Sequence, residues 1–193
     1  MFRFFAFLRA INVGHGRTVK MRSLRQIFES LGFSMVETFI ASGNVIFETT
    51  TQKTKTLERK IEKALHEGLG YEVRTLVRRE AELAKIAHYQ PFRPSKFDDK
   101  WQMNIIFLAD NPSQKLKRDV KALRTNTDAF EVHGQEIYWL RRRKRSAGPF
   151  STVPLEKVVG RVFTVRAAST IKEIAAKYCG RFTHNLGHAH SAV

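Results

Sequence analysis

The chain has 193 residues, of which 42% are hydrophobic and 27% charged, so it can bury a core in one domain or in two small ones. Its single cysteine, Cys179, excludes an intramolecular disulfide and a cysteine-based zinc site. No segment approaches the ~18 apolar residues that a membrane span requires, and the formal net charge is +16. We therefore expect a globular protein of the cytoplasm.

Basic residues are spread evenly along the sequence. Residues 1–96 and residues 97–193 each carry 17 lysines and arginines against 9 aspartates and glutamates. The charge is therefore not a basic tail attached to a neutral domain. Because such a surface attracts phosphate polyanions over about a Debye length, we expect the partner to be nucleic acid or another polyanion.

Strands and helices alternate in the first half of the chain. An apolar run near the N-terminus predicts a buried strand, and apolar residues at 3.6-residue spacing predict a helix that Gly32 ends. The segment Ser42-Gly43-Asn44 separates two stretches rich in β-formers and predicts a hairpin. Strands are expected over residues 3–8, 35–41, 45–48 and 72–77, and helices over residues 20–31 and 54–69.

The second half has the same order of elements without a residue-level repeat. It opens with a helix over residues 80–88 and an irregular stretch over residues 89–100. Pro112 suits the first turn of a helix, and Gly134-Gln135 predicts a second hairpin. Strands are expected over residues 102–108, 129–133, 136–140 and 162–165, and helices over residues 112–123, 153–159 and 168–179.

This order of elements predicts an α+β fold built from two tandem ferredoxin-like (split βαβ) subdomains packed together. The first subdomain is expected over residues 1–79 and the second over residues 80–182. Residues 183–193 are expected to be a flexible tail. The tail contains three histidines, which are His184, His188 and His190. Nothing positions their rings, so we predict no metal site there.

Two polar loops are expected to meet in the first subdomain. In a split βαβ unit the sheet order 4-1-3-2 brings the end of the first strand and the hairpin between the second and third strands to one edge. The candidate anion-binding residues of these loops are Arg9, Asn12, Gly14, Lys20, Ser42, Gly43 and Asn44. The alternative is turn chemistry, because glycine and asparagine tolerate a positive φ and asparagine bonds nearby backbone.

A pattern of residues across the first 50 positions carries a family resemblance. Its members are Phe7–Gly14, Val19–Met21, Leu24, Leu31–Phe33, Val36–Thr38 and Ala41–Glu48. The pattern resembles the signature of the DUF1697 family, with thinner similarity at Asn104–Leu108, Ala129–Phe130 and Ile137–Tyr138. This resemblance implies the paired ferredoxin-like architecture and an uncharacterised cytoplasmic bacterial protein. It implies no established activity and supplies no catalytic residue.

The chain also departs from the family pattern in two places. Ala10 stands where a glycine is usual. Residues 166–170, with the sequence Arg-Ala-Ala-Ser-Thr, replace a segment that resembles Thr-x-Arg-Asn-Trp-Asn-Thr in the family. If the Asn-Trp-Asn of the family helps to build a site, that site is lost or altered in this chain.

A basic run follows the strand expected over residues 136–140. The candidate nucleic-acid-binding residues are Arg141, Arg142, Arg143, Lys144 and Arg145 of the run, with Lys117 and Lys121 of the preceding helix. Tyr138 and Trp139 lie beside the run, and such a combination suits phosphate contacts with base stacking, although no RNP-like motif is present. The alternative is a solvated mobile loop that keeps the protein soluble.

The sequence contains no recognisable catalytic motif. Asp98-Asp99 is the one carboxylate pair in a loop, and we expect it to be exposed. Residues 12–16 match neither a phosphate-binding Walker loop nor a dinucleotide fingerprint. The sequence predicts no cofactor and no metal, and it does not decide whether the protein is an enzyme.

Three functions are compatible with these observations. The first is binding of a polyanion such as RNA or DNA through residues 141–145 and their neighbours. The second is a small anionic metabolite-binding protein or enzyme that uses the edge formed by Arg9, Asn12, Ser42 and Asn44. The third is a dimeric interaction module that pairs through an exposed strand or a sheet face rich in phenylalanine.

Overall fold

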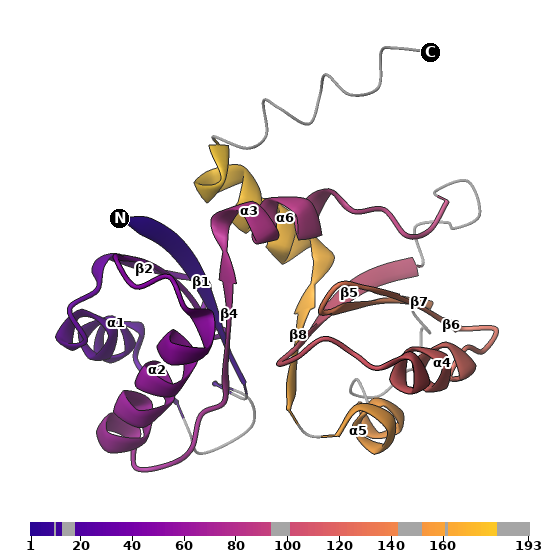
Figure 1. Cartoon of the computed structure of the whole chain (residues 1–193), viewed down its shortest axis with the longest axis horizontal. Coiled ribbons are helices and arrows are strands. Elements are labelled where there is room, and N and C mark those ends of the chain that lie inside the picture. Colours follow the sequence, from indigo (N-terminus) through magenta and orange to yellow (C-terminus); the bar gives the residue numbers. More distant parts are fainter. Residues whose placement is uncertain (10, 13–17, 94–100, 143–151, 161, 181–193) are drawn as a thin grey trace. The chain divides into compact units, whose positions relative to one another are not determined.

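The computed structural model describes residues 1–9, 11–12, 18–93, 101–142, 152–160 and 162–180. This part of the chain is a mixed α+β structure with two four-stranded antiparallel sheets and six helices (Figure 1). It divides into two compact units. The first comprises Met1–Lys85 and the segment that begins at Ile174, and the second comprises Ile86–Glu173.

The first unit has the element order β-α-β-β-α-β. Its elements are β1 (Phe2–Leu8), α1 (Met21–Ser30), β2 (Ser34–Phe39), β3 (Asn44–Thr49), α2 (Thr54–Leu69) and β4 (Thr75–Arg79), followed by α3 (Glu80–His88). The strands lie in the order β2-β3-β1-β4. Both amphipathic helices, α1 and α2, cover one face of the sheet (Figure 1).

Phenylalanines fill the core between this sheet and its helices. The ring of Phe47 in β3 lies 4.5 Å from Phe33, 5.6 Å from Phe28 and 5.8 Å from Phe4, measured between centroids. Three of these side chains, Phe4, Phe28 and Phe47, are at most 1% exposed. The sequence contains 15 phenylalanines, and four of them form this one cluster.

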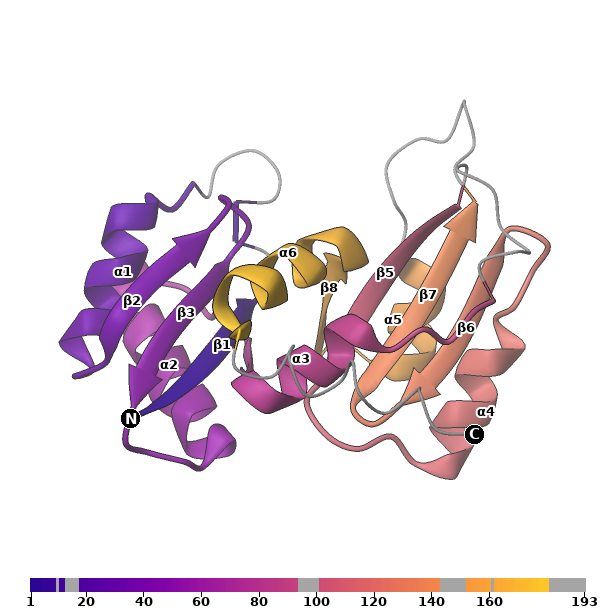
Figure 2. The ribbon, with the colours of Figure 1, turned by 90° about the horizontal axis from the view of Figure 1, so that it is seen from above.

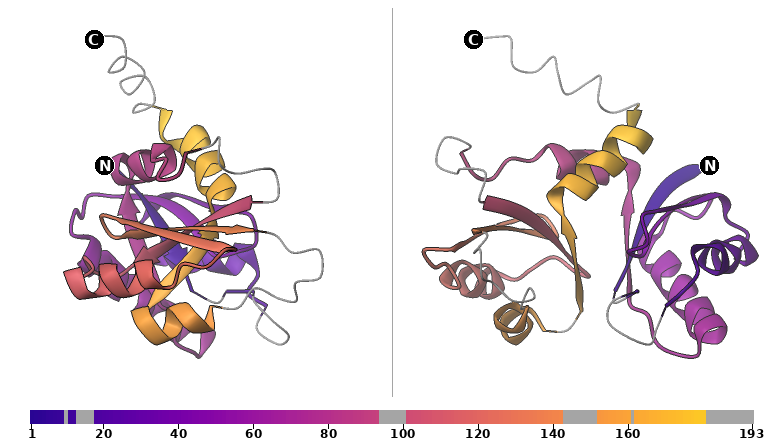
Figure 3. Two further views of the ribbon diagram at one scale, coloured as in Figure 1. Left: turned by 90° about the vertical axis from the view of Figure 1, so that its right-hand side faces the viewer. Right: turned by 180° about the vertical axis from the view of Figure 1, so that it is seen from behind.

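The second unit repeats the element order. Its elements are β5 (Trp101–Leu108), α4 (Gln114–Ala122), β6 (Asp128–His133), β7 (Glu136–Arg142), α5 (Val153–Val159) and β8 (Phe163–Ala167), followed by α6 (Ala168–Tyr178). The strands lie in the order β6-β7-β5-β8, which corresponds strand for strand to the first sheet. The helices α4 and α5 lie on one face of this sheet (Figure 3).

The C-terminal end of α6 belongs to the first unit, where it packs on the sheet face opposite α1 and α2. The ring of Tyr178 lies 6.4 Å from Phe5 and 6.5 Å from Phe39. Its hydroxyl donates to Glu37 Oε2 at 2.6 Å, and Arg3 donates to its carbonyl at 2.7 Å. Because both faces of the sheet are covered, β1 is buried at consecutive positions rather than alternate ones.

The sequence predicted the helices and strands well. It predicted less well which segments distant in the chain pack together. The helices α2, α3 and α5 have the expected bounds, and Gly32 and Gly70 adopt φ values of 78° after α1 and α2. Residues 80–182 were expected to form one second subdomain. The two compact units instead divide after Lys85, and the segment that begins at Ile174 belongs to the first unit. No helix of the described residues is long and apolar enough to cross a membrane.

Candidate functional site

The two polar loops of the first unit come together as predicted. The backbone N–H of Leu8 donates to the Gly43 carbonyl at 2.8 Å, and the Asn12 amide donates to the Ala41 carbonyl at 3.1 Å. Of the predicted residues, Gly14 lies outside the described residues. The hairpin between β2 and β3 therefore lies against the segment that follows β1.

The asparagines of these loops bond to nearby groups of the chain. Asn12, at a φ of 56°, accepts from the Val19 N–H at 2.7 Å and donates to the Val19 carbonyl at 3.2 Å. Asn44 is 1% exposed and donates to the Phe39 carbonyl at 3.0 Å and to Ser42 Oγ at 2.8 Å. These contacts are the turn chemistry that the sequence offered as the alternative.

The basic members of this candidate site lie at the ends of elements. Lys20 is exposed, and its carbonyl accepts from the Leu24 N–H at 3.1 Å in the first turn of α1. Arg9 is half-buried, and its backbone N–H donates to the Arg74 carbonyl at 2.8 Å. The contacts of Asn12 and Asn44 are explained by the turns that they stabilise and do not require a ligand. An anion site at this edge therefore stays a prediction.

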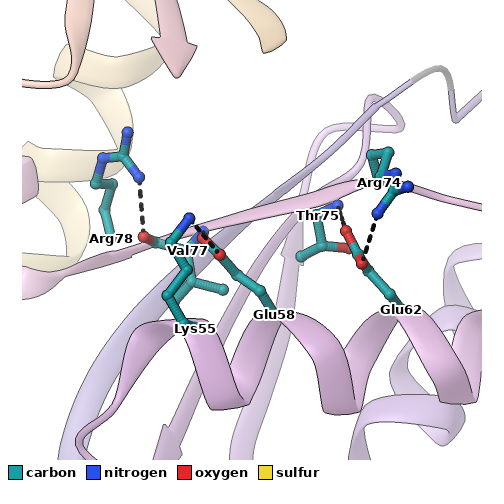
Figure 4. Close-up of polar contacts among 7 residues, drawn as sticks. All are labelled: Lys55, Glu58, Glu62, Arg74, Thr75, Val77 and Arg78. Carbon is teal, nitrogen blue, oxygen red and sulfur yellow. Dashed lines mark hydrogen bonds and ion pairs between the residues drawn. The ribbon is translucent and has the colours of Figure 1, made fainter. Parts of the chain in front are cut away.

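Three carboxylates cap the outer edge of β4. Glu58 and Glu62, one turn apart on α2, point at the strand (Figure 4). Glu58 accepts from the Val77 N–H at 3.0 Å, and Glu62 accepts from the Thr75 N–H at 2.9 Å. At the end of the strand, the Arg79 N–H donates to Glu82 at 2.8 Å. Lys55 Nζ lies 3.3 Å from Glu58 Oε2, and Arg74 Nη1 lies 3.3 Å from Glu62 Oε2.

None of these carboxylates was singled out from the sequence, where Glu58 and Glu62 belonged to the charged face of the helix expected over residues 54–69. Glu58 is only 7% exposed because it follows the core residue Leu57 and faces the strand. Its oxygens are occupied by a backbone N–H and a lysine, so the group stabilises the edge of the sheet and is not arranged for acid–base catalysis.

Replacing Glu58 by alanine is expected to lower the free energy of unfolding by about 1–3 kcal/mol, because it leaves the Val77 N–H without its acceptor. Glu58→Gln keeps an acceptor oxygen and should retain most of that stability. Urea denaturation measures both changes, and amide hydrogen exchange at Val77 reports the local effect. Equal loss in the two variants would show that the charge, and not the hydrogen bond, stabilises this edge.

Two buried arginines occupy corresponding positions in the two units. Arg78 in β4 is 3% exposed and pairs in register with Phe5, and Arg166 in β8 is 9% exposed and pairs with Ile105. Arg166 donates to Thr164 Oγ1 at 2.7 Å. Burial lowers the pKa of the Arg166 guanidinium to about 10, so it stays protonated at neutral pH. Each arginine directly follows a valine in its strand, Val77 in β4 and Val165 in β8.

The basic run of the second unit begins inside a strand. Arg141 and Arg142 are the last residues of β7 and pair with Gln102 and Trp101 of β5. For these two residues the expected loop was wrong, because β5 starts early enough to extend the pairing. The other predicted residues of the run, Arg143, Lys144 and Arg145, lie outside the described residues.

The aromatic residues beside this run are part of the core. Tyr138 is 0% exposed and Trp139 is 4% exposed. The Trp139 ring stacks on Phe130 at 5.6 Å, and its indole N–H donates to Asp128 Oδ1 at 2.8 Å. Burial raises the pKa of Tyr138 well above its usual value, with the charge of Glu136 adding to the effect. These rings are therefore not available to stack on bases.

A basic helix lies close to the end of β7. The nine residues of α4 include Lys115, Lys117, Arg118 and Lys121, with Asp119 as the one acid. Ser113 caps the helix by accepting from the Leu116 N–H at 3.1 Å. The segment after α4 reaches β7, since the Arg142 N–H donates to the Thr127 carbonyl at 2.8 Å.

The described residues contain no group of three or more histidine, cysteine, aspartate or glutamate side chains that could hold a metal ion. Burial raises the pKa of the Cys179 thiol to about 12, which makes it a poor nucleophile. A hollow of about 240 Å³ on the first unit is lined by Glu62, Lys63, His66, Glu72, Val73 and Arg74. Its Arg74 and Glu62 form an ion pair, and no catalytic arrangement follows from these residues.

Comparison with known proteins finds a matching family model and a similar solved structure. The model of a family described as "Protein of unknown function (DUF1697)" matches residues 1–138. The solved structure of the conserved bacterial protein SP0830 from Streptococcus pneumoniae is similar, with a TM-score of 0.69 and 21% sequence identity. That similarity covers 92% of this chain and 98% of the other. No curated protein matches the chain.

Proposed function

The chain belongs to the DUF1697 family, and from this premise we propose that it binds nucleic acid through the phosphate backbone, using the second unit. The observation that carries the proposal is the concentration of basic residues on and directly after α4, which are Lys117, Arg118, Lys121 and Arg124. Three of these residues lie on α4 and the fourth follows it, and the bond from the Arg142 N–H to the Thr127 carbonyl brings the end of β7 to the segment after the helix.

The proposed contacts are with phosphates and not with bases. Lysine and arginine neutralise phosphates whatever the sequence of the nucleic acid. Stacking of unpaired bases needs exposed rings, whereas Tyr138 and Trp139 are buried in the second unit. The proposed binding is therefore independent of sequence and depends strongly on salt.

We also propose that each unit is a ferredoxin-like subdomain of a cytoplasmic protein. The strand orders β2-β3-β1-β4 and β6-β7-β5-β8 and the β-α-β-β-α-β order of elements support this description. In this arrangement the two helices within each β-α-β-β-α-β order lie on one face of the sheet, α1 and α2 in the first unit and α4 and α5 in the second. That leaves α4 on the surface, where its basic side chains can meet a ligand.

The test is a salt titration of binding to duplex DNA, single-stranded RNA and heparin. Changing Lys117, Arg118, Lys121 and Arg124 to glutamine should weaken nucleic-acid binding and reduce the salt slope by about 3.6, at about 0.9 for each of the four lost phosphate contacts. A matched variant removes the same charge from exposed residues elsewhere, which are Arg22, Arg59, Lys85 and Lys172. Equal losses in the two variants, or equal binding to heparin, would contradict a defined nucleic-acid surface.

A further inference from the structure

The two edges of the first sheet are closed to further strands. At β4, the outward N–H groups of Thr75, Val77 and Arg79 all donate to carboxylates. At β2, the register with β3 shifts between Ser34 and Glu37, where Met35 has a φ of 49°. A bulge and a row of occupied donors are both devices that prevent another strand from pairing.

The strand of the second unit that corresponds to β2 is β6, and its edge is regular. It lies beside β7 at the edge of the sheet (Figure 2). Six consecutive residue pairs join the two strands, and the register does not shift. The bond from the Arg142 N–H to the Thr127 carbonyl fixes which residues bond to β7, because bonded and non-bonded pairs alternate in an antiparallel ladder. By this alternation Asp128, Phe130 and Val132 direct their backbone groups outward.

The outward groups of β6 differ in what they contact. The Asp128 carbonyl accepts from the Thr125 N–H at 2.9 Å, which closes one end of the strand. For the outward N–H and carbonyl groups of Phe130 and Val132, the described part of the chain provides no hydrogen-bond partner. These four groups have the spacing of an edge that can add one strand.

An ion pair crosses this edge. Phe130 stacks on Trp139 on the face that α4 covers, so the neighbouring side chain of Glu131 lies on the opposite face. Lys121 of α4 nevertheless places its Nζ 3.1 Å from Glu131 Oε1, and it must pass around the edge to do so. Both side chains are accessible, at 54% and 32% exposure, and an exposed pair of this kind contributes little to stability.

We propose that β6 binds an extended acidic peptide as an added strand. The peptide backbone would bond to the outward groups of Phe130 and Val132, and a peptide carboxylate would replace Glu131 as the partner of Lys121. The chemical class of the bound peptide is inferred from the charge around the strand. The basic residues of α4 flank the strand, and the chain carries a net charge of +16, which favours an acidic partner and disfavours a second copy. This site goes beyond the proposed nucleic-acid surface, although the two share Lys121.

The experiment compares Val132→Pro with Val132→Ala in the full chain. Both variants shorten the same half-buried side chain, but only proline removes the outward N–H, and it leaves the ladder to β7 intact. The probe is a blocked peptide in which valine and glutamate alternate. It should bind to the wild type and to Val132→Ala, and about tenfold more weakly to Val132→Pro. Equal affinities in the two variants would overturn the proposal.

Two further probes test the chemistry of the occupant. Polyglutamate has the charge without the strand propensity, and a valine–lysine peptide has the propensity with the opposite charge. Binding of either as tight as that of the valine–glutamate peptide would overturn an acidic strand. A dimer of the wild type that Val132→Pro dissociates would instead assign the edge to a second copy, and would also overturn it.

A measurement on the wild type keeps the test valid if Val132→Pro does not fold. Amide hydrogen exchange at Phe130 and Val132 should slow when the valine–glutamate peptide is added, while exchange at the capped Val77 should not change. Unchanged exchange at both β6 amides would overturn the proposal. A variant that changes only Arg118 and Arg124 to glutamine tests the nucleic-acid surface separately, because it leaves Lys121 and the β6 edge unchanged.

Discussion

Replacing Phe47 by alanine is expected to lower the free energy of unfolding by about 3–5 kcal/mol, the range for deleting a buried aromatic side chain. Phe47 is 0% exposed, and its ring contacts those of Phe4, Phe28 and Phe33. The substitution removes the apolar surface of the ring and leaves a cavity that three large neighbours cannot all fill. Urea denaturation followed by far-UV circular dichroism measures the change.

Phe2→Ala is the matched control, because this residue lies on β1 of the same sheet but is 48% exposed. Its loss should be well under half of that at Phe47, in proportion to the smaller area removed from the core. Since the chain forms two compact units, the first unit can unfold in a transition of its own. A Phe47→Ala variant that shifted only the transition of the second unit would contradict this account of the core.

The sequence predicted those elements whose pattern is local. The bounds of α2 follow from its apolar stripe and from Gly70, which provides the left-handed residue after the helix. Strand ends depend on partners far away in the chain. The strand expected from residue 72 begins at Thr75, because its partner Leu8 is the last residue of β1. The expected strand end at residue 140 moved to Arg142 because β5 begins at Trp101.

The candidate sites show the same division between local and distant information. Strand order alone predicted that the segment after β1 meets the β2–β3 hairpin, and it does. The burial of Tyr138 and Trp139 could not be predicted from their position beside a basic run. Consecutive residues of a strand face opposite sides of a sheet, so both are buried only when both faces are covered. That depends on the tertiary structure and not on the run.

Gly43 is the position where backbone conformation and close packing both demand glycine. Its φ is 72°, and a Cβ placed there would lie 3.0 Å from Leu8 Cβ and 3.1 Å from Ile11 Cβ. Both neighbouring atoms are β-carbons, which are bonded directly to the backbone and cannot rotate away. Gly43→Ala should therefore lower the free energy of unfolding by about 2–4 kcal/mol, through the positive φ and through overpacking.

Gly32→Ala separates these two causes. Gly32 has a φ of 78°, and a Cβ there would have nothing within 4 Å. The substitution therefore costs only the strain of a positive φ, without overpacking. Its expected loss is about 1 kcal/mol, because the reduced entropy of the unfolded chain offsets part of the strain. The difference between the two variants in urea denaturation then measures how tightly the hairpin packs on Leu8. Equal losses would mean that the hairpin moves aside, and that the close approach of the two loops contributes little to the fold.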